Sequence, residues 1–594
     1  MAFDASTSVG VVTPRVTTLS LKDGLYRLEE GGTLPRVDVA WESCGLERPE
    51  NDNVVFICHA LTGDAHVAGM RPGEHKPSGW WEGMVGPGRA IDTNRYRVIC
   101  ANVLGGCMGT TGPMSINPAT GRPYGSAFPR YTISDTVDVY RALLREIGVT
   151  HLAAVIGGSF GGMQVVDWIT RHPDEMDAAA VIASSVSLNT QALAYDVVGR
   201  AAITDDPDWL GGDYYGTGDG KGPVKGLAAA RQLAHITYLS RDLLQEKFDR
   251  NLQASWLEKG PAFREAQARK FKTLFQIESY LGYQAEKFIN RFDANSYLQI
   301  THAMDRFDAG TRYGSIEAAF QRVKCRVLVV SLSGDVLFSE EQSREIAGGL
   351  LAAGKRVTYC HLEIGTGHDA FLTHIDDLSK LVGGFLGTPR PDVKDWQRRH
   401  YAPIVKMVPK GAHVLDIGCG KGTLLNLLRT ERGATGNGVE IDVPEFEEAL
   451  ADGNDVLWED ADEKLSLVPD GHFDLAVVSE TLQVVKRPRE LLKEVLRVAR
   501  EAVVSFPNFA AYRIRFTLGL LGHLPVSRQL PFQWYDTPNI HLVTLKDFRA
   551  LCAEEGIVIR EVVAESRHPF GKLLLALGFK NLGASRLVCR IARK

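Results

Sequence analysis

The stretch AAVIGGSFGGMQ, Ala153 to Gln164, is an apolar run that ends in four glycines around one serine. It contains GGSFG (157–161), the pattern G-x-S-x-G, between a predicted strand and a predicted helix. In that setting the glycines permit a sharp strand-to-helix turn, which lifts the serine hydroxyl above the sheet at a helix N-terminus. A glycine-rich turn with a capping serine would use the same five letters, so the motif alone leaves both interpretations open.

Six short apolar runs recur over the first two thirds of the chain. They are VVFICHAL (54–61), RVICANVL (97–104), LAAVIGGS (152–159), AAAVIASS (178–185), RVLVVSLSGD (326–335) and VTYCHLEI (357–364). Helical patterns such as SDTVDVYRALLREIG separate several of them. Near-continuous apolar strands that alternate with helices are typical of a parallel sheet covered on both faces, so the sequence predicts an α/β fold.

Two further residues follow predicted strands in the chain order of a hydrolase triad. Asp335 ends the run SLSGD, and His368 follows the last of the six runs in GTGHDAFL. A serine nucleophile needs a base within hydrogen-bond reach and an acid that orients the base, and the order Ser…Asp…His is that of α/β-hydrolases. We therefore assign Ser159 as nucleophile, His368 as base and Asp335 as orienting acid. The oxyanion donors would be the backbone N–H groups of Phe160 and Leu61.

Composition excludes several classes of protein. The 594 residues are 44% hydrophobic and 23% charged, with a formal net charge of −5, as in a globular protein of two or more domains. There is no long Lys or Arg block, no apolar run near the roughly 18 residues of a membrane span, and no signal-peptide pattern. The nine cysteines stand singly, which argues against a zinc site. We expect a cytoplasmic protein without a nucleic-acid partner, a membrane partner or a metal.

The predicted secondary-structure pattern changes at two places along the chain. Between residues 186 and 322 the strand pattern gives way to helical text such as AAARQLAHITYLSRDLLQEKF, which predicts a helical lid beside the site. After GGFLGTPRPDVKDWQRRH (383–400) a new α/β pattern begins. We therefore predict a first domain over 1–388 with its lid at about 186–322, a linker over 389–400 and a second domain over 401–594.

Seven blocks of the first domain resemble homoserine O-acyltransferases of the MetX type. They are HALTGDAH (59–66), GWWEGMVGPGRAIDT (79–93), GPMSINPATGRPYG (112–125), GGSFGGMQ (157–164), ARQLAHITYLS (230–240), RFDANSYL (291–298) and GHDAFL (367–372). The resemblance covers roughly residues 8–388 and implies an α/β-hydrolase fold with the triad Ser159, Asp335 and His368. It also implies that Arg231 and Asp369 bind homoserine, and that the lids form a homodimer. A guanidinium and a carboxylate suit the two charged ends of an amino acid.

The resemblance implies a ping-pong transfer. Acyl-CoA would acylate Ser159, CoA would leave, and the hydroxyl of L-homoserine would attack with His368 as base. The text after the triad acid, VLF (336–338), is apolar where succinyl-specific relatives carry an arginine, so acetyl-CoA is the expected co-substrate. Succinyl transfer, serine as the acceptor and plain ester hydrolysis by the same triad remain alternatives.

A second glycine-rich turn opens the second domain. In HVLDIGCGKGTLL (413–425) a predicted strand runs into Asp416, Gly418 and Gly420, and Glu440 ends the next predicted strand. Rossmann-like domains hold nucleosides in this way. The turn resembles motif I of S-adenosylmethionine-dependent methyltransferases. The blocks FDLAVVSETLQVV (473–485), VVSFPNF (503–509) and LPFQWYDTPNIHLVTLKDF (530–548) resemble the MetW family over about 395–570.

This resemblance implies a Rossmann-like class I methyltransferase fold in which five residues would bind S-adenosylmethionine: Asp416, Gly418, Gly420, Glu440 and Asp460. Asp462 is the alternative to Asp460 for the contact with adenine. Lys421 departs from the family pattern, where an acidic residue is expected. Tyr535, Asp536 and His541 are polar candidates for a methyl-acceptor site, although a polar surface loop is the commoner explanation. We therefore expect a domain that activates or regulates the first, held beside it by fusion. The alternative is an active methyltransferase, which would make the chain bifunctional.

Overall fold

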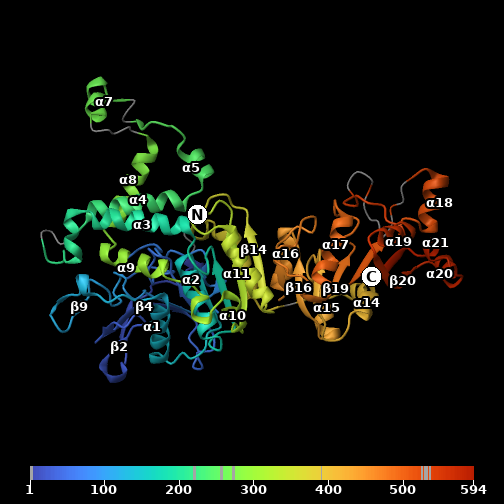
Figure 1. The fold of residues 1–594 in the computed structure, drawn as a ribbon, viewed down its shortest axis with the longest axis horizontal. Coiled ribbons are helices and arrows are strands. Elements are labelled where there is room, and N and C mark those ends of the chain that lie inside the picture. The colour runs from blue at the N-terminus through green and yellow to red at the C-terminus, as the bar shows by residue number, and fades with distance from the viewer. Residues whose placement is uncertain are drawn as a thin grey trace. The chain divides into compact units, whose positions relative to one another are not determined.

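The computed structural model describes residues 5–217, 222–254, 258–269, 275–389, 391–523, 526, 533 and 537–594. The chain divides into two compact units, one of residues 1–355 and 360–386 and the other of residues 356–359 and 387–594. Each unit has an α/β architecture (Figure 1).

The first unit is built on a mainly parallel sheet in the order β1-β4-β8-β5-β11-β12-β13-β14. Strands β8, β5, β11, β12 and β13 run parallel, whereas β1 and β4 form the antiparallel edge. Every residue of β5, β8, β11 and β12 is buried, as the continuous apolar runs predict. The strands are β1 (Arg15–Thr18), β4 (Asp38–Gly45), β5 (Val54–Cys58), β8 (Arg97–Ala101), β11 (Ala154–Gly158), β12 (Ala178–Ile182), β13 (Arg326–Leu332) and β14 (Val357–Leu362).

Short strand pairs and helices complete this unit. The pairs are β2 (Tyr26–Arg27) with β3 (Thr33–Leu34), β6 (Val85–Gly86) with β7 (Ile91–Asp92), and β9 (Ile116–Asn117) with β10 (Arg122–Pro123). The helices that accompany the sheet are α1 (Ile133–Glu146), α2 (Phe160–Arg171), α10 (Ile316–Gln321), α11 (Glu340–Ala352), α12 (Ala370–Thr373) and α13 (Ile375–Leu386). Helix α2 packs on β11 and β12, so the turn at Ser159 lies directly above the centre of the sheet.

Six α-helices belong to the described residues between β12 and α10. They are α3 (Thr190–Thr204), α4 (Val224–Tyr238), α5 (Arg241–Phe248), α7 (Pro261–Ala268), α8 (Gln276–Ile289) and α9 (Ala294–Asp305). Helix α3 packs against α4 and α9, and α4 packs against α8. In Figure 1 these helices, drawn in green, lie together on one side of the first unit.

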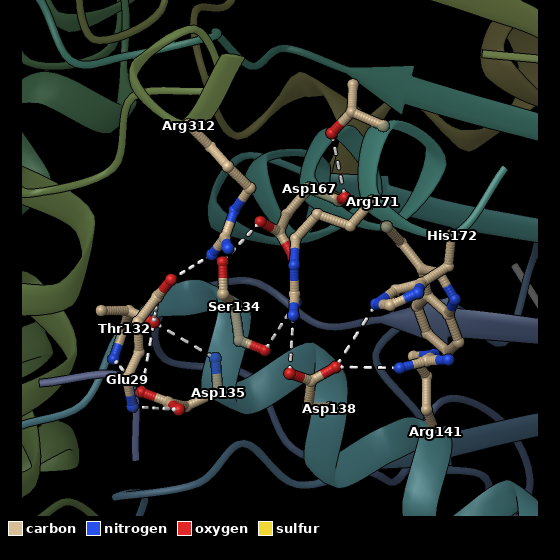
Figure 2. Close-up of polar contacts among 12 residues, drawn as sticks. Glu29, Thr132, Ser134, Asp135, Asp138, Arg141, Asp167, Arg171, His172 and Arg312 are labelled. Carbon is tan, nitrogen blue, oxygen red and sulfur yellow. Dashed lines mark hydrogen bonds and ion pairs between the residues drawn. The ribbon is translucent and has the colours of Figure 1, made fainter. Parts of the chain in front are cut away.

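A polar network joins α1 to α2 (Figure 2). Asp138 on α1 accepts bonds from Arg171 at 2.7 Å and Arg141 at 3.0 Å. Arg171 also pairs with Asp167 at 3.1 Å, and Asp167 accepts a bond from the Ser134 hydroxyl at 2.7 Å. The network therefore fixes the helix that begins at Ser159.

The second unit has the strand order β17-β16-β15-β18-β19-β21-β20. The first five strands are parallel and β21 is antiparallel to both of its neighbours. With β15 counted as the first, the parallel part has the order 3-2-1-4-5, as in Rossmann-like folds. The strands are β15 (His413–Ile417), β16 (Thr435–Val439), β17 (Asp455–Leu457), β18 (Phe473–Ser479), β19 (Ala499–Pro507), β20 (Ile557–Glu565) and β21 (Arg586–Arg593).

Helices accompany this second sheet in the chain. They are α14 (Asp395–Met407), α15 (Thr423–Arg432), α16 (Val443–Ala451), α17 (Pro488–Val498), α18 (Tyr512–Leu521), α19 (Leu545–Glu554), α20 (Pro569–Ala576) and α21 (Lys580–Gly583). Helix α14 begins inside the stretch 389–400 that we expected to be a linker, because Gln397 caps the backbone N–H of Lys394 and starts the helix. No helix among the described residues is long and apolar enough to cross a membrane.

Candidate active site

Ser159 occupies the turn between β11 and α2. Its φ is 58° and its ψ is −128°, a conformation that non-glycine residues rarely adopt. Its backbone N–H donates to the carbonyl of Ile182 on β12 at 2.9 Å, so the adjacent strand holds the turn in place. Strain that is fixed by surrounding structure is common at functional sites.

The structure brings Ser159, His368 and Asp335 together. His368 Nε2 lies 2.8 Å from Ser159 Oγ, and His368 Nδ1 lies 2.7 Å from Asp335 Oδ2. Asp335 Oδ1 accepts the backbone N–H groups of Leu337 and Phe338, each at 2.9 Å. The acid is therefore fixed by its own loop, and its other oxygen orients the imidazole.

The environment of His368 favours the imidazolium form. Burial by itself would lower the pKa of His368, but the charge and hydrogen bond of Asp335, with the charge of Asp369, raise the pKa above its usual value. Ser159 and His368 are both buried. A base with a raised pKa takes the serine proton more readily, and Asp335 then stabilises the cation that forms.

A pocket of about 500 Å³ opens above the triad. Leu61, Ser159 and His368 line it, so the residue that carries one predicted oxyanion donor borders the same cavity as Ser159. Phe160 is the first residue of α2, and the N–H groups of a helix's first turn have no partner within that helix. The two predicted donors therefore belong to Phe160, which directly follows Ser159, and to Leu61, which lines the pocket.

Arg231 on α4 and Asp369, which follows His368, line the same pocket. The Arg231 guanidinium lies over the Phe288 ring, 4.5 Å from its centroid, and contacts Thr62 Oγ1 at 3.4 Å. Its Nε is buried without a hydrogen-bond partner in the described part of the chain. Burial raises the pKa of Asp369, although the nearby charges of His368 and Arg231 act to lower it. A cation and an acid therefore face one cavity, as amino-acid recognition requires.

Sequence reasoning missed the aromatic residues that hold Arg231. Tyr238 lies seven residues further along α4, and its ring centroid is 5.3 Å from the guanidinium carbon of Arg231. Phe288 comes from α8. The spacing of seven residues between Arg231 and Tyr238 was the available signal, because it places both on one face of a helix. The packing of α8 against α4 has no such local signal.

In the second unit Asp416 and Glu440 stand at the ends of the neighbouring strands β15 and β16. Asp416 is buried, and its Oδ1 has no partner within the described residues. Burial, with the nearby charge of Glu440, raises the pKa of Asp416 to about 7. Glu440 accepts the backbone N–H of Gly420 at 2.8 Å and those of Ile441 and Asp442 at 2.9 and 3.0 Å, so it holds the glycine turn.

The other predicted residues of this unit are placed as follows. Gly418 and Gly420 have φ of 70° and 52° in the turn after β15. Asp460 follows β17, and its Oδ1 accepts the N–H of Asp462 at 2.8 Å. Lys421 pairs with Glu448 on α16 at 2.7 Å. Tyr535 and Asp536 lie outside the described residues, whereas the N–H of His541 donates to Gln483 at 3.1 Å.

No group of three or more His, Cys, Asp or Glu is placed to hold a metal ion among the residues that the structure describes. None of the nine cysteines, all of which the structure describes, forms a disulfide, and seven of them are buried.

Two families match the chain, "alpha/beta hydrolase fold" over residues 53–375 and "Methionine biosynthesis protein MetW" over residues 398–575. The bifunctional methionine biosynthesis protein MetXA/MetW of Rhodopirellula baltica is 39% identical over 558 residues, which cover 90% of this chain and 87% of that protein. The chain belongs to the family of bifunctional MetXA/MetW proteins. The predicted resemblance of its two parts to MetX and MetW is thereby confirmed.

The MetXA part has further relatives. The homoserine O-acetyltransferase of Solidesulfovibrio magneticus is 46% identical over 64% of this chain and 94% of that protein. The homoserine O-succinyltransferase of Halothiobacillus neapolitanus is 44% identical over a region that covers 64% of this chain and 91% of that protein. Identity alone therefore does not separate the two acyl groups.

Solved structures confirm the α/β-hydrolase fold of the MetXA part. The homoserine O-acetyltransferase of Bacillus anthracis is 28% identical, covers 64% of this chain and 98% of its own, and superposes with a TM-score of 0.57. Esterase E22 is also 28% identical, covers 63% of this chain and all of its own, and gives a TM-score of 0.56. Because a transferase and an esterase fit equally well, the fold does not decide between transfer and hydrolysis.

Proposed function

We propose that the MetXA unit transfers an acetyl group from acetyl-CoA to the hydroxyl of L-homoserine, as a step of methionine biosynthesis. The observation that carries this proposal is the pocket in which the triad faces both Arg231 and Asp369. The guanidinium binds the carboxylate of homoserine and Asp369 binds its ammonium group, so that the side-chain hydroxyl meets the acylated Ser159.

The mechanism uses the protein groups in two steps. His368 takes the proton of Ser159 as the serine attacks the thioester carbonyl. It then gives that proton to the sulfur as the carbon–sulfur bond breaks, so CoA leaves as its thiol. The N–H groups of Phe160 and Leu61 bind the oxyanion, and loss of one such donor costs about 100-fold or more in rate. His368 then takes the proton of the homoserine hydroxyl as that oxygen attacks the ester, and it gives the proton to Ser159 Oγ as the bond to the acyl group breaks.

Several features support transfer of acetyl to an amino acid. Leu337, in the apolar stretch after the triad acid, lines the pocket, and an apolar wall suits a methyl group better than a second carboxylate. Succinyl transfer, serine as acceptor and ester hydrolysis are the competing functions. The unpartnered Nε of Arg231 favours an acceptor that carries a carboxylate over water.

The test compares acetyl-CoA with succinyl-CoA, and L-homoserine with L-serine, using steady-state transfer and thioester hydrolysis. We expect acetyl-CoA with homoserine to have the highest kcat/KM, and Ser159→Ala to lose more than about 1,000-fold in kcat. Ser78→Ala is the matched control, because Ser78 lines the pocket but bonds Glu74 instead of the triad. Substantial transfer by Ser159→Ala would exclude the covalent route, and faster hydrolysis than transfer would favour an esterase.

For the MetW unit we propose a regulatory role that uses S-adenosylmethionine as its ligand. The unpartnered Oδ1 of Asp416 suits the ammonium group of that molecule, and Gly418 and Gly420 have the positive φ of a tight turn after the strand. Glu440 would hold the glycine turn and meet the ribose, with Asp460 beside the adenine. The ligand carries an electrophilic methyl group, and methyl transfer to a separate acceptor is the competing role. A cytoplasmic homodimer, in which exposed lid side chains such as Tyr283 pack together, completes the proposal.

A further inference from the structure

The turn that carries Leu61 is bonded by a residue of the lid. Residues Ala60 to Gly63 form a β-turn, in which the Gly63 N–H donates to the Ala60 carbonyl at 2.9 Å. The Thr62 carbonyl, within this turn, accepts a hydrogen bond from Arg291 Nη2 at 2.6 Å. Arg291 lies just beyond the end of α8. A guanidinium of the lid therefore bonds the turn one residue away from the predicted oxyanion donor.

These bonds form a chain that ends at the Leu61 N–H. A peptide group is planar and trans, so its C=O and N–H point in opposite directions and move together. Arg291 bonds the C=O of the Thr62–Gly63 peptide. The N–H of that peptide bonds the Ala60 oxygen, which belongs to the same peptide group as the Leu61 N–H. Two rigid peptide groups therefore connect the guanidinium to the oxyanion donor.

The same chain strengthens the Leu61 N–H as a donor. Hydrogen bonds that follow one another in a chain polarise one another, so each donor strengthens the next. The first donor is the guanidinium of Arg291, which keeps its full charge in a protein. Leu61 lines the catalytic pocket, and within the described residues its N–H makes no hydrogen bond. The donor at the end of the chain is therefore available to an oxyanion.

The core of the unit holds the other side of this turn. His59, which is buried, donates from Nδ1 to the Ala60 oxygen at 2.8 Å. His59 Nε2 accepts the backbone N–H of Val103 at 3.2 Å, so the ring proton must lie on Nδ1. Burial lowers the pKa of His59, which keeps the ring neutral. The core thus supplies a neutral bond, and Arg291 supplies the charged end of the chain.

We propose that Arg291 is a positioning residue of the oxyanion hole, which orients and polarises the Leu61 N–H through the two peptide groups of the turn. A second lid residue, Arg231, contacts the hydroxyl of Thr62 at 3.4 Å, so the lid meets this turn at two points. The proposal rests on the proposed acyl transfer. It makes the lid part of the acylation of Ser159, in addition to its role in binding the acceptor.

The first experiment measures acylation of Ser159 in the full chain. The burst of p-nitrophenol from p-nitrophenyl acetate reports this step without an amino-acid acceptor. We expect Arg291→Met to lower the burst rate constant about 10-fold, which is less than the roughly 100-fold that loss of a whole oxyanion donor costs. Lys287→Met is the matched control, because it removes an exposed cation that lines the same pocket four residues earlier. It should stay within about twofold of the wild type.

The second experiment tests the oxyanion hole itself with two ketones. The Ser159 oxygen adds to the carbonyl carbon of an alkyl trifluoromethyl ketone, its proton passes to His368, and the ketone oxygen becomes an oxyanion. The matching methyl ketone only occupies the pocket. We expect Arg291→Met to weaken inhibition by the trifluoromethyl ketone about 10-fold, and inhibition by the methyl ketone less than about threefold. Equal weakening of both, as a disturbed fold would give, or unchanged inhibition by the trifluoromethyl ketone would overturn the proposal.

The outcomes separate this proposal from the proposed function. If the wild-type chain gives no burst, Ser159 is not acylated and the proposed function fails. If it gives a burst but transfers no acyl group to L-homoserine, the proposed function fails while the two ketones still decide the role of Arg291. A wild-type burst rate in Arg291→Met refutes the role of Arg291 alone. Arg291→Gln gives the same comparison should Arg291→Met not fold.

Discussion

Each of the four glycines around Ser159 stands where another element approaches closely. A Cβ on Gly157 would lie 2.2 Å from the carbonyl oxygen of Gly161, and one on Gly161 would lie 2.1 Å from that of Cys58 on β5. A Cβ on Gly158 would meet the Phe371 ring at 2.7 Å, and one on Gly162 would meet Ser184 Cβ at 2.5 Å. The glycines therefore serve close packing as well as the turn itself.

Gly161→Ala is expected to damage both the fold and the site. The added carbon would press on the backbone of Cys58, which is fixed in the centre of the sheet, and we expect a loss of about 3 kcal/mol or more of unfolding free energy. Ser159 would shift with the start of α2, so kcat should fall as well. Thermal unfolding and steady-state kinetics measure the two effects.

Gly282→Ala is the control for this variant. Gly282 lies within α8, and a Cβ there would meet nothing within 4 Å. It should gain about 0.5–1 kcal/mol, because alanine suits a helix better than glycine. Equal changes in unfolding free energy and in kcat for the two variants would show that crowding at Gly161 affects neither stability nor activity.

The residues of the site differ in how far sequence could predict them. Ser159, Asp335 and His368 each follow a buried strand, and parallel strands bring their carboxyl ends to one edge, so local patterns suffice to predict their approach. Arg231 lies over the Phe288 ring only because α4 packs against α8. That packing depends on the three-dimensional arrangement of the lid helices, which no local pattern encodes.

At the level of elements, the α1–α2 network fixes the helix α2, whose N-cap is Ser159. Asp167, whose side chain is 7% exposed, lies on α2 between Ser134 of α1 and Arg171. The carboxyl group is buried with a cation at one side and a hydroxyl at the other. Removing a member of such a network leaves the remaining groups unpaired, and this cost exceeds the net value of the pair.

Asp167→Ala should therefore destabilise the MetXA unit by about 2–4 kcal/mol. The urea midpoint for loss of acyl transfer should fall, whereas KM for homoserine in buffer should stay close to that of the wild type. Lys324→Ala removes an exposed pair with Asp174, whose side chains are 62% and 75% exposed, and should cost less than about 1 kcal/mol. A midpoint of Asp167→Ala equal to that of Lys324→Ala would contradict the role of the network.

The presence of helices and strands was easier to predict from the sequence than the residues at which they begin and end. The apolar runs predicted buried strands such as β5, β11 and β13, because parallel strands covered on both faces have continuous apolar sequence. The start of α14 inside the expected linker was harder, since a lysine occupies the cap position and the capping bond comes from Gln397. Serine, threonine, aspartate and asparagine are the usual signals there.

For the whole molecule, fusion keeps one MetW unit present for every MetXA unit. A covalent link makes their encounter independent of protein concentration. A ligand that binds the MetW unit can then change acyl transfer only if it has a different affinity for the more active and less active states of the chain. Ligand binding and kinetic effect are therefore separate measurements.

Binding of S-adenosylmethionine to the full chain should depend on pH through Asp416. With a pKa of about 7, this carboxyl group is mostly protonated at pH 6 and ionised at pH 8. The ionised form is the one that attracts an ammonium group, so affinity should rise with pH through about 7. It should fall again above roughly pH 8, where an α-amino group loses its proton.

Isothermal titration of the full chain from pH 6 to pH 9 measures this profile. Asp416→Asn should weaken binding about tenfold or more near pH 7.5 and remove the rise between pH 6 and 8, because the titrating group is gone. Asp470→Asn is a matched control, since the Asp470 side chain is 82% exposed and pairs with Arg497. Acyl transfer measured with and without the ligand then separates the outcomes. Binding that leaves the transfer rate unchanged would exclude regulation by this ligand, and an absence of binding at every pH would exclude the ligand itself.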